Sequence, residues 1–373
     1  MDTAGDRGMS DINFKPITTL REPTELVAHG LVSVADLPDL EKVAARYAVA
    51  VTPDVAALID PDDPQDPIAL QYVPSAEELV AQPNETPDPI GDDAHSPVSG
   101  IVHRYPDRVL FKLVHVCAVY CRFCFRREMV GPGKATALTQ GAYDNALAYI
   151  RAHPEIWEVI LTGGDPLMLS PRRLAEIMAD LARIDHVRII RIHTRVPVAE
   201  PSRISSEMVA ALKVQGATTW VALHANHVRE LTRKARAACA AIVDAGIPMV
   251  SQSVLLRGVN DDVATLEALM RGFVECRIKP YYLHHGDLAP GTSHLRTSLE
   301  KGQEIMRRLR ARVSGLCQPD YVVDIPGGHG KAPVGPGYLS VEDSFSPQRE
   351  QPPEKRYRII DYCGDVHLYP PEP

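Results

Sequence analysis

The chain has 373 residues, of which 45% are hydrophobic and 24% charged, and a formal net charge of −8. This composition is typical of a soluble globular protein, and the acidic balance argues against a nucleic-acid binder, which needs a basic face. No apolar run approaches the roughly 20 residues of a membrane span, and residues 1–10 lack a signal-peptide core. The seven cysteines, an odd number, favour a reducing cytoplasm.

Residues 1–98 are predicted to form an N-terminal helical and irregular extension. Helical patterns cover 37–47 and 52–59. Ser75, with Glu78 three positions later, forms a capping box that opens a third helix. The segments 60–67 and 84–97 are rich in proline and acidic residues. They could bind something, but we interpret them as extended, solvated surface loops.

From residue 109 onward, short apolar runs alternate with helical patterns. The six predicted strands are 109–115, 158–161, 187–194, 218–224, 248–255 and 279–285. The helical patterns are 140–152, 171–184, 204–214, 229–245, 264–276 and 299–313. Such alternation implies βαβ units and a parallel sheet. We predict an α/β fold with a partial (β/α)6 TIM-like barrel in a core of residues 99–335, followed by a C-terminal tail, 336–373.

Three cysteines, Cys117, Cys121 and Cys124, follow the first predicted strand with the spacing C-x3-C-x2-C. Three thiolates so spaced can hold three irons of a [4Fe–4S] cube and leave the fourth iron open to a non-protein ligand. Three close cysteines cannot all pair in disulfides, and no nearby Cys or His at zinc-finger spacing completes a zinc site. We therefore predict a [4Fe–4S] cluster, bound at the carboxyl end of a barrel strand.

This segment resembles the radical S-adenosylmethionine (radical SAM) enzymes. In that family the open iron binds the amino and carboxyl groups of SAM, and an electron from the cluster cleaves SAM to a 5′-deoxyadenosyl radical. The resemblance implies a barrel of the radical SAM type, SAM as cofactor, and a reducing electron donor such as flavodoxin or ferredoxin.

A second chemical feature is the glycine-rich stretch 327–330, which ends at Lys331. Its backbone N–H groups could cradle a phosphate, but it fails as a Walker A motif because the spacing is wrong and Ala332 follows the lysine. A loop that delivers one lysine suits a Schiff base with an aldehyde. Taken alone, an ordinary turn followed by a surface lysine explains the stretch equally well.

The cluster motif and the lysine together resemble the lysine 2,3-aminomutase family, radical SAM enzymes that also use pyridoxal phosphate (PLP). The likeness extends from about Ser99 to Tyr338 and includes the segments 103–108, 125–128, 161–167, 226–227, 252–261, 281–283, 287–288 and 294–297. It implies that Lys331 is catalytic and forms the Schiff base with PLP. The other residues implied to bind cofactors are Arg104, Tyr105 and Arg108 for PLP, and Gly163, Gly164, Asp165 and Gln252 for SAM.

Three further residues concern the substrate. Arg126 matches the family's carboxylate-binding arginine, and a guanidinium suits the carboxylate of an amino acid. Asp287 and Asp324 match two aspartates that bind the ε-ammonium group of lysine. A glutamate-specific relative would replace them, because a carboxylate facing two carboxylates is strongly disfavoured. The alternative is that Asp287 caps a loop and Asp324 orients the glycine-rich turn.

We predict an isomerase that converts L-lysine to β-lysine (3,6-diaminohexanoate), a small-molecule enzyme of the cytoplasm and a homo-oligomer. The main rival is the family branch that acts on a lysine of a translation elongation factor, since it shares the start of the cysteine motif. A 2,3-aminomutase for glutamate or arginine is a further alternative. So are a plain iron–sulfur electron carrier and a radical SAM methyltransferase or dehydrogenase without PLP.

Two departures from the family pattern stand out. The long-form family has a structural zinc, but Asp262 stands where the first zinc-binding cysteine should be, and the tail carries only Cys363. We therefore expect the zinc to be absent. His284 stands where a tyrosine is usual near PLP, which leaves the stacking contact with that cofactor in doubt.

Overall fold

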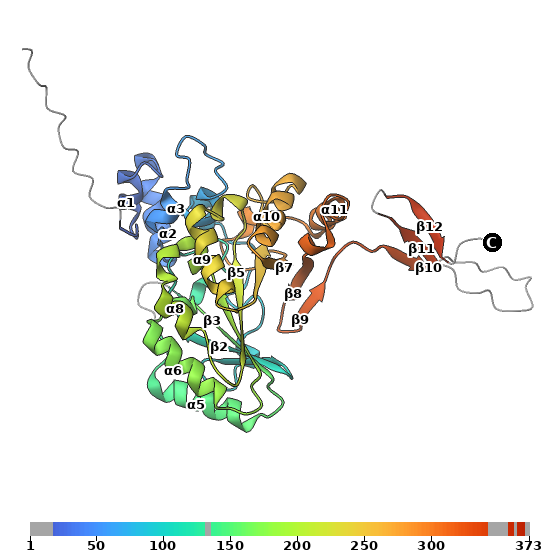
Figure 1. The fold of residues 1–373 in the computed structure, drawn as a ribbon. Coiled ribbons are helices and arrows are strands. Elements are labelled where there is room, and N and C mark those ends of the chain that lie inside the picture. The colour runs from blue at the N-terminus through green and yellow to red at the C-terminus, as the bar shows by residue number, and fades with distance from the viewer. Residues whose placement is uncertain (1–17, 131–135, 342–356, 362–363, 370–373) are drawn as a thin grey trace, which may run out of the picture.

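The computed structural model describes residues 18–130, 136–341, 357–361 and 364–369 (Figure 1). Its centre is a nine-stranded sheet in which the strands follow one another in chain order, and which curls into a nearly closed barrel. The strands are β1 (Ile101–Tyr105), β2 (Arg108–Val114), β3 (Glu158–Gly163), β4 (Ile189–Thr194), β5 (Thr218–His224), β6 (Met249–Val254), β7 (Ile278–His284), β8 (Asp320–Ile325) and β9 (Gly330–Pro333). Strands β2 to β8 are parallel, and β1 and β9 are antiparallel edges.

All six predicted strands are confirmed as β2 to β7, in a parallel sheet of the α/β class. The prediction missed three more: β1, β8 and β9. Because β8 pairs with β9 in an antiparallel hairpin, the glycine-rich stretch is the turn of this hairpin and Lys331 lies on a strand. That hairpin places the lysine at a defined position on the wall of the barrel.

Helices on the outside of the sheet connect successive parallel strands (Figure 1). They are α5 (Gln140–Ala152), α6 (Pro171–Ala182), α7 (Val196–Ala199), α8 (Ser206–Ala211), α9 (Arg233–Asp244), α10 (Val263–Glu275) and α11 (Leu299–Arg310). Most begin at a Ser, Thr or Asp whose side chain accepts a backbone N–H of the first turn, which is why the predicted starts lie close to the observed ones.

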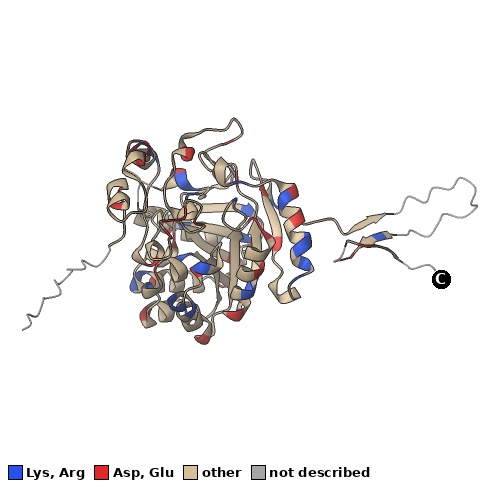
Figure 2. Ribbon diagram, turned by 90° about the horizontal axis from the view of Figure 1, so that it is seen from above, with Lys and Arg blue, Asp and Glu red and all other residues tan. Residues whose placement is uncertain are grey.

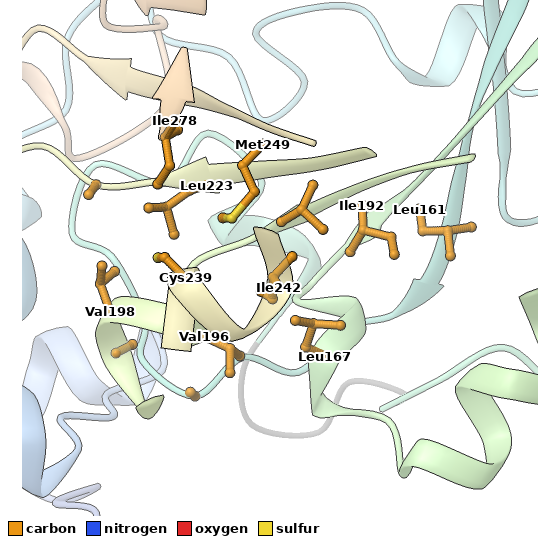
Figure 3. Close-up of a cluster of buried hydrophobic side chains, with 14 of the residues drawn as sticks. Leu161, Leu167, Ile192, Val196, Val198, Leu223, Cys239, Ile242, Met249 and Ile278 are labelled. Atoms are coloured by element: carbon orange, nitrogen blue, oxygen red, sulfur yellow. The ribbon is translucent and has the colours of Figure 1, made fainter. Parts of the chain in front are cut away.

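The strands bury their apolar side chains against these helices. Figure 3 shows Ile192, Leu223 and Met249, from three adjacent strands, packed around Ile242 of α9. Since side chains alternate along a strand, the residues between these apolar ones face the inside of the barrel. The inward positions include the polar residues Arg191, His193, His224 and Gln252. The fold thus brings polar side chains of three adjacent strands to the inside of the barrel.

The N-terminal extension contains α1 (Pro23–Ala28), α2 (Leu37–Arg46), α3 (Pro53–Ala56) and α4 (Ala69–Tyr72). The capping box of Ser75 and Glu78 is confirmed, but it opens a single 3-10 turn rather than an α-helix. Interpreting the acidic segments of this extension as solvated loops is wrong for Asp66 and Asp92, which are buried. Each of these carboxylates, like Glu78, meets an arginine of the barrel. The extension is therefore anchored to the core by ion pairs.

The tail contains a small antiparallel sheet of β10 (Leu339–Val341), β11 (Tyr357–Ile360) and β12 (Val366–Tyr369), which projects away from the barrel in Figures 1 and 2. In the view of Figure 2, acidic and basic residues are interspersed along the outer helices. Of the described helices, none is both long and apolar enough to span a bilayer.

Candidate active site

The three cysteines of the motif lie on the loop that follows β2, residues 117–124, called here the cluster loop. All three are half-buried and free of disulfide bonds. Burial raises the pKa of each thiol, to about 11 for Cys121, although the nearby positive charge of Arg195 acts in the opposite direction. Iron binding would displace these protons, because the ligand is the thiolate. Three free thiols on one loop are a donor set that fits an iron–sulfur cluster.

Among the described residues, no three His, Cys, Asp or Glu side chains are arranged to hold a single metal ion. Each cysteine of a cluster binds a different iron, so its sulfurs need not converge on one point. Asp262, at the expected zinc position, caps α10 by accepting the N–H of Thr265 at 3.0 Å. Cys363 lies outside the described residues, so the absence of zinc stays a prediction.

Gly163 ends β3, Gly164 follows it, and both lie against the backbone of residues 114–116, just before the cluster loop. The N–H of Gly164 donates to the carbonyl of Val114 at 2.5 Å, and that of Asp165 donates to Val116 at 2.9 Å. A Cβ atom on Gly164 would lie 2.3 Å from the carbonyl oxygen of Val116, and one on Gly163 would lie 2.5 Å from that of Val114. Only glycine allows this close approach, which fixes the turn beside the cysteines.

Asp165 and Gln252 are both buried in the protein interior. The Asp165 carboxylate accepts hydrogen bonds from the Thr194 hydroxyl and from the backbone N–H of Arg195 and of Leu167. It therefore supports the turn after β3, and its contact with SAM stays a prediction. The Gln252 amide nitrogen lies 3.4 Å from Nε2 of His193 inside the barrel.

The N-terminal extension braces the cluster loop through Glu78, a residue that sequence reasoning assigned only to a helix cap. Its carboxylate accepts two hydrogen bonds from Arg122, at 2.9 and 2.5 Å, and another from Arg127. A second brace is Arg195, which pairs with Glu230 at 2.8 Å and contacts the hydroxyl of Tyr72. All these side chains are buried. The capping-box pattern gave a hint of Glu78, but nothing in the sequence linked it to Arg122.

Lys331 projects from β9 directly opposite Asp324 of β8. Its Nζ donates to both carboxylate oxygens of Asp324 at 2.7 Å, and its backbone N–H donates to the Tyr105 hydroxyl at 2.6 Å. A Cβ on Gly330 would lie 2.8 Å from that hydroxyl, and one on Gly328 would lie 2.7 Å from Nε2 of His95. The glycines thus let the hairpin pack closely against β1 and the N-terminal extension.

Arg126 and Arg104 share one buried carboxylate, that of Asp92. Arg126 donates through Nε and Nη2 to Oδ2 at 3.0 and 2.8 Å, and Arg104 donates to Oδ1 at 3.1 Å. Burial favours the neutral form of Asp92, but the positive charges around it hold its pKa below the usual value. Sequence reasoning missed Asp92, because it lies in an acidic stretch that looks like many solvated loops.

Asp287 and Asp324 form the acidic side of the site. Burial, with the negative charge of Asp324 as a second cause, raises the pKa of Asp287 to about 7. The pKa of Asp324 is strongly lowered in spite of burial, because His284 and Lys331 bond to it. The imidazole Nδ1 of His284 lies 3.6 Å from the Asp324 carboxylate. One carboxylate is therefore ionised while its neighbour still holds a proton near neutral pH.

The residues expected around PLP fit such a group. Nε of Arg104 and Nε2 of His284 are buried without a hydrogen-bond partner among the described residues, as expected of groups that await a ligand. Arg108 lies over the Tyr105 ring, with its guanidinium carbon 3.8 Å from the ring centroid, and it also pairs with Asp107. The structure therefore gathers the expected substrate and PLP residues on one side of the barrel interior, with Arg108 at its edge.

Comparison with known proteins identifies the family. The Radical SAM superfamily profile matches residues 111–269. L-lysine 2,3-aminomutase of Clostridium subterminale is 44% identical over 291 residues, which cover 78% of this chain and 70% of that protein. That of Fusobacterium nucleatum is 42% identical over 344 residues, 92% of this chain and 80% of its own length.

One further relative and one solved structure have names other than L-lysine 2,3-aminomutase. Glutamate 2,3-aminomutase of Clostridioides difficile is 38% identical over 303 residues, covering 80% of this chain and 70% of that protein. The solved structure of a radical SAM methyltransferase from Sphaerobacter thermophilus covers 60% of this chain and 68% of its own, at 24% identity and a TM-score of 0.43. On the identities and coverages of the aminomutases, the chain belongs to the lysine 2,3-aminomutase family of radical SAM enzymes, isomerases that use a [4Fe–4S] cluster and SAM.

Proposed function

We propose that this enzyme moves the α-amino group of L-lysine to C3 to give β-lysine, with PLP bound to Lys331. The single observation that carries the proposal is the bond between the Lys331 ammonium and both oxygens of Asp324, beside Asp287. Asp324 already binds one alkylammonium group in the protein, and Asp287 places a second carboxyl next to it. When Lys331 is engaged by the cofactor, the same pair is free for the ε-ammonium of the substrate.

The remaining residues take complementary roles. Arg126 binds the substrate carboxylate through the edge of its guanidinium that Asp92 leaves free. Arg104, Tyr105 and Arg108 surround the PLP. The cluster with SAM supplies a carbon radical that can take a hydrogen atom from the substrate, and PLP supplies an aldehyde that holds the migrating nitrogen.

Positions around the cluster complete the assignment. Cys117, Cys121 and Cys124 hold the iron, while Gly163, Gly164, Asp165 and Gln252 line the SAM site. The backbone N–H groups of Gly164 and Asp165 are bonded to Val114 and Val116, just before Cys117, so this turn would hold SAM beside the cluster.

Charge favours lysine over the alternatives. Two adjacent aspartates disfavour the side-chain carboxylate of glutamate. A guanidinium also suits an aspartate pair, so arginine is the closer competitor, and a protein-bound lysine would present the same ammonium. The structure offers no specific observation that favours either of these over free lysine.

The test is to reconstitute the protein anaerobically with iron, sulfide, PLP, SAM and a reductant, and to analyse products by mass spectrometry. We expect β-lysine from L-lysine and little product from L-arginine or L-glutamate. No β-lysine, together with isomerisation of a lysine in an elongation factor or of another amino acid, would refute the substrate. Lys331→Ala should keep the cluster absorbance and lose both the absorbance of lysine-bound PLP and all activity.

A further inference from the structure

Lys112 lies on β2, between the predicted PLP residue Arg108 and the cluster loop. The alternate residues Phe111 and Leu113 face the outer helices, and the Phe111 ring stacks on Tyr143 of α5 with centroids 5.8 Å apart. Lys112 therefore points into the barrel. Its Cα would lie 3.2 Å from a Cβ on Gly163, which places it beside the glycine turn of the predicted SAM site.

The ammonium group of Lys112 has no hydrogen bond and no ion pair with any described residue, although the residue is only 6% exposed. Burial lowers its pKa, which the negative charge of Asp92 partly offsets. A lysine is rarely this buried without an anionic partner. The side-chain nitrogen of Lys112 is not among the fully buried polar atoms that lack a partner, so this largely buried side chain ends at a point that solvent or a ligand can reach. A residue of this kind inside a binding site indicates that a ligand supplies the missing anion.

The charges around Asp92 support the same conclusion. Arg126, Arg104 and Lys112 all act on this one buried carboxylate. Asp92 bonds to the two arginines, whereas the lysine has no hydrogen bond or ion pair within the described part of the chain. Arg126 and Lys112 lie on the Asp92 side of the site, whereas Arg104 also lies 3.9 Å from the Asp324 carboxylate. The substrate carboxylate is the anion expected next to Arg126.

We propose that Lys112 and Arg126 together bind the α-carboxylate of the amino acid substrate, so that Lys112 is a specificity-determining residue of this site. The inference rests on the proposed function insofar as it takes an amino acid to bind beside Arg126. Lys112 would supply a second cation, beside Arg126, for the substrate carboxylate. The affinity of a ligand that lacks a carboxylate should therefore not depend on Lys112.

The test measures binding without catalysis, on PLP-loaded enzyme with its cluster but without SAM. The dissociation constants of L-lysine and of 1,5-diaminopentane, which lacks the carboxylate, are obtained from the change in PLP absorbance. Lys112→Met should weaken L-lysine binding by about 10- to 100-fold, as for a lost charged hydrogen bond, and leave 1,5-diaminopentane unchanged. Lys279→Met, on β7 outside the site, is the matched control and should change neither constant.

A structural role for Lys112 predicts a different result. If the amine served the fold, Lys112→Met would lower the melting temperature of the ligand-free protein, whereas loss of an unpaired buried charge should leave it unchanged or raise it. Equal affinity of variant and wild type for L-lysine would overturn the proposal. So would weaker PLP binding with unchanged affinity for lysine at saturating PLP, which would assign Lys112 to the phosphate.

The same titrations separate this inference from the proposed function. L-arginine and L-glutamate are titrated alongside L-lysine on the wild-type enzyme. If another amino acid binds instead of lysine, the substrate assignment is wrong, and the effect of Lys112→Met is then read on that amino acid. If no L-amino acid binds to the PLP-loaded enzyme, both proposals fail.

Discussion

The cluster loop and the amino acid site lie in one barrel, but their buried charges are balanced differently. Around the cluster loop, protein groups pair with one another: Glu78 binds Arg122 and Arg127, and Arg195 binds Glu230. In the amino acid site, Lys112 has no hydrogen bond or ion pair with any described residue. Asp287 keeps its proton up to about pH 7.

This difference indicates two ways of preparing a site. The cluster loop is held rigid by protein contacts, which suits three ligands that must meet a preformed inorganic cube. The amino acid site keeps charges that only a ligand can match, and it gains affinity when the ligand arrives. We therefore expect substitutions at the loop to damage structure and cofactor content, and those at the amino acid site to change affinity.

The largest effect is expected at the cysteines. Cys121→Ala should abolish the visible absorbance of the reconstituted cluster and all SAM cleavage, because two thiolates leave a second iron without a protein ligand. Cys239→Ala is the control, since Cys239 is a buried free thiol on α9 outside the loop. Equal iron content in the two variants would show that the loop does not hold the cluster.

The next largest effect is expected at Glu78, the residue that braces the cluster loop. Glu78→Gln leaves two buried guanidinium groups without a carboxylate and should lower the free energy of unfolding by about 3–5 kcal/mol. The cluster content after reconstitution should fall with it. Chemical denaturation measures the first effect and iron analysis the second. Asp39→Asn, which breaks an exposed pair with Lys42, should cost under about 1 kcal/mol; equal losses would refute the brace.

A smaller effect concerns Asp287 and pH. Below pH 7 this carboxyl is neutral, and above pH 7 it is charged, since burial and Asp324 raise its pKa to about 7. An ammonium ligand binds the charged form better, so the affinity for L-lysine should rise about tenfold from pH 6 to pH 8. Asp287→Asn should remove this pH dependence and bind weakly throughout. A variant with the wild-type pH profile would contradict the assignment to Asp287.

Much of this fold could be predicted from the sequence, because the alternation of apolar runs and capped helices is local. The six strands β2 to β7 follow from it. The β8–β9 hairpin could not be predicted from this local pattern, because its strands are defined by the pairing of Asp324 with Lys331 across a glycine turn. A glycine-rich stretch predicts only a loop when the strand that pairs with its flanking residues is not known.

The site shows the same limit. Cys117 and Lys331 stand in motifs with a chemical meaning, whereas Asp92 and Lys112 do not. Asp92 looks like a surface acid and Lys112 like an ordinary strand residue, and only the fold shows that both are buried beside Arg126. Charge partners that are distant in sequence leave no local pattern, and these are the residues that distinguish one amino acid site from another.

The smallest expected effect lies outside both regions, at Asp262. Asp262→Ala should cost about 1 kcal/mol of stability, the usual value for a lost helix cap, and leave iron content and activity unchanged. The zinc content of wild type and variant should be equally negligible. Stoichiometric zinc in the wild type that the variant loses would make Asp262 a metal ligand. Its carboxylate would then serve a bound ion as well as the first turn of α10, and the departure from the family pattern at this position would not remove the zinc site.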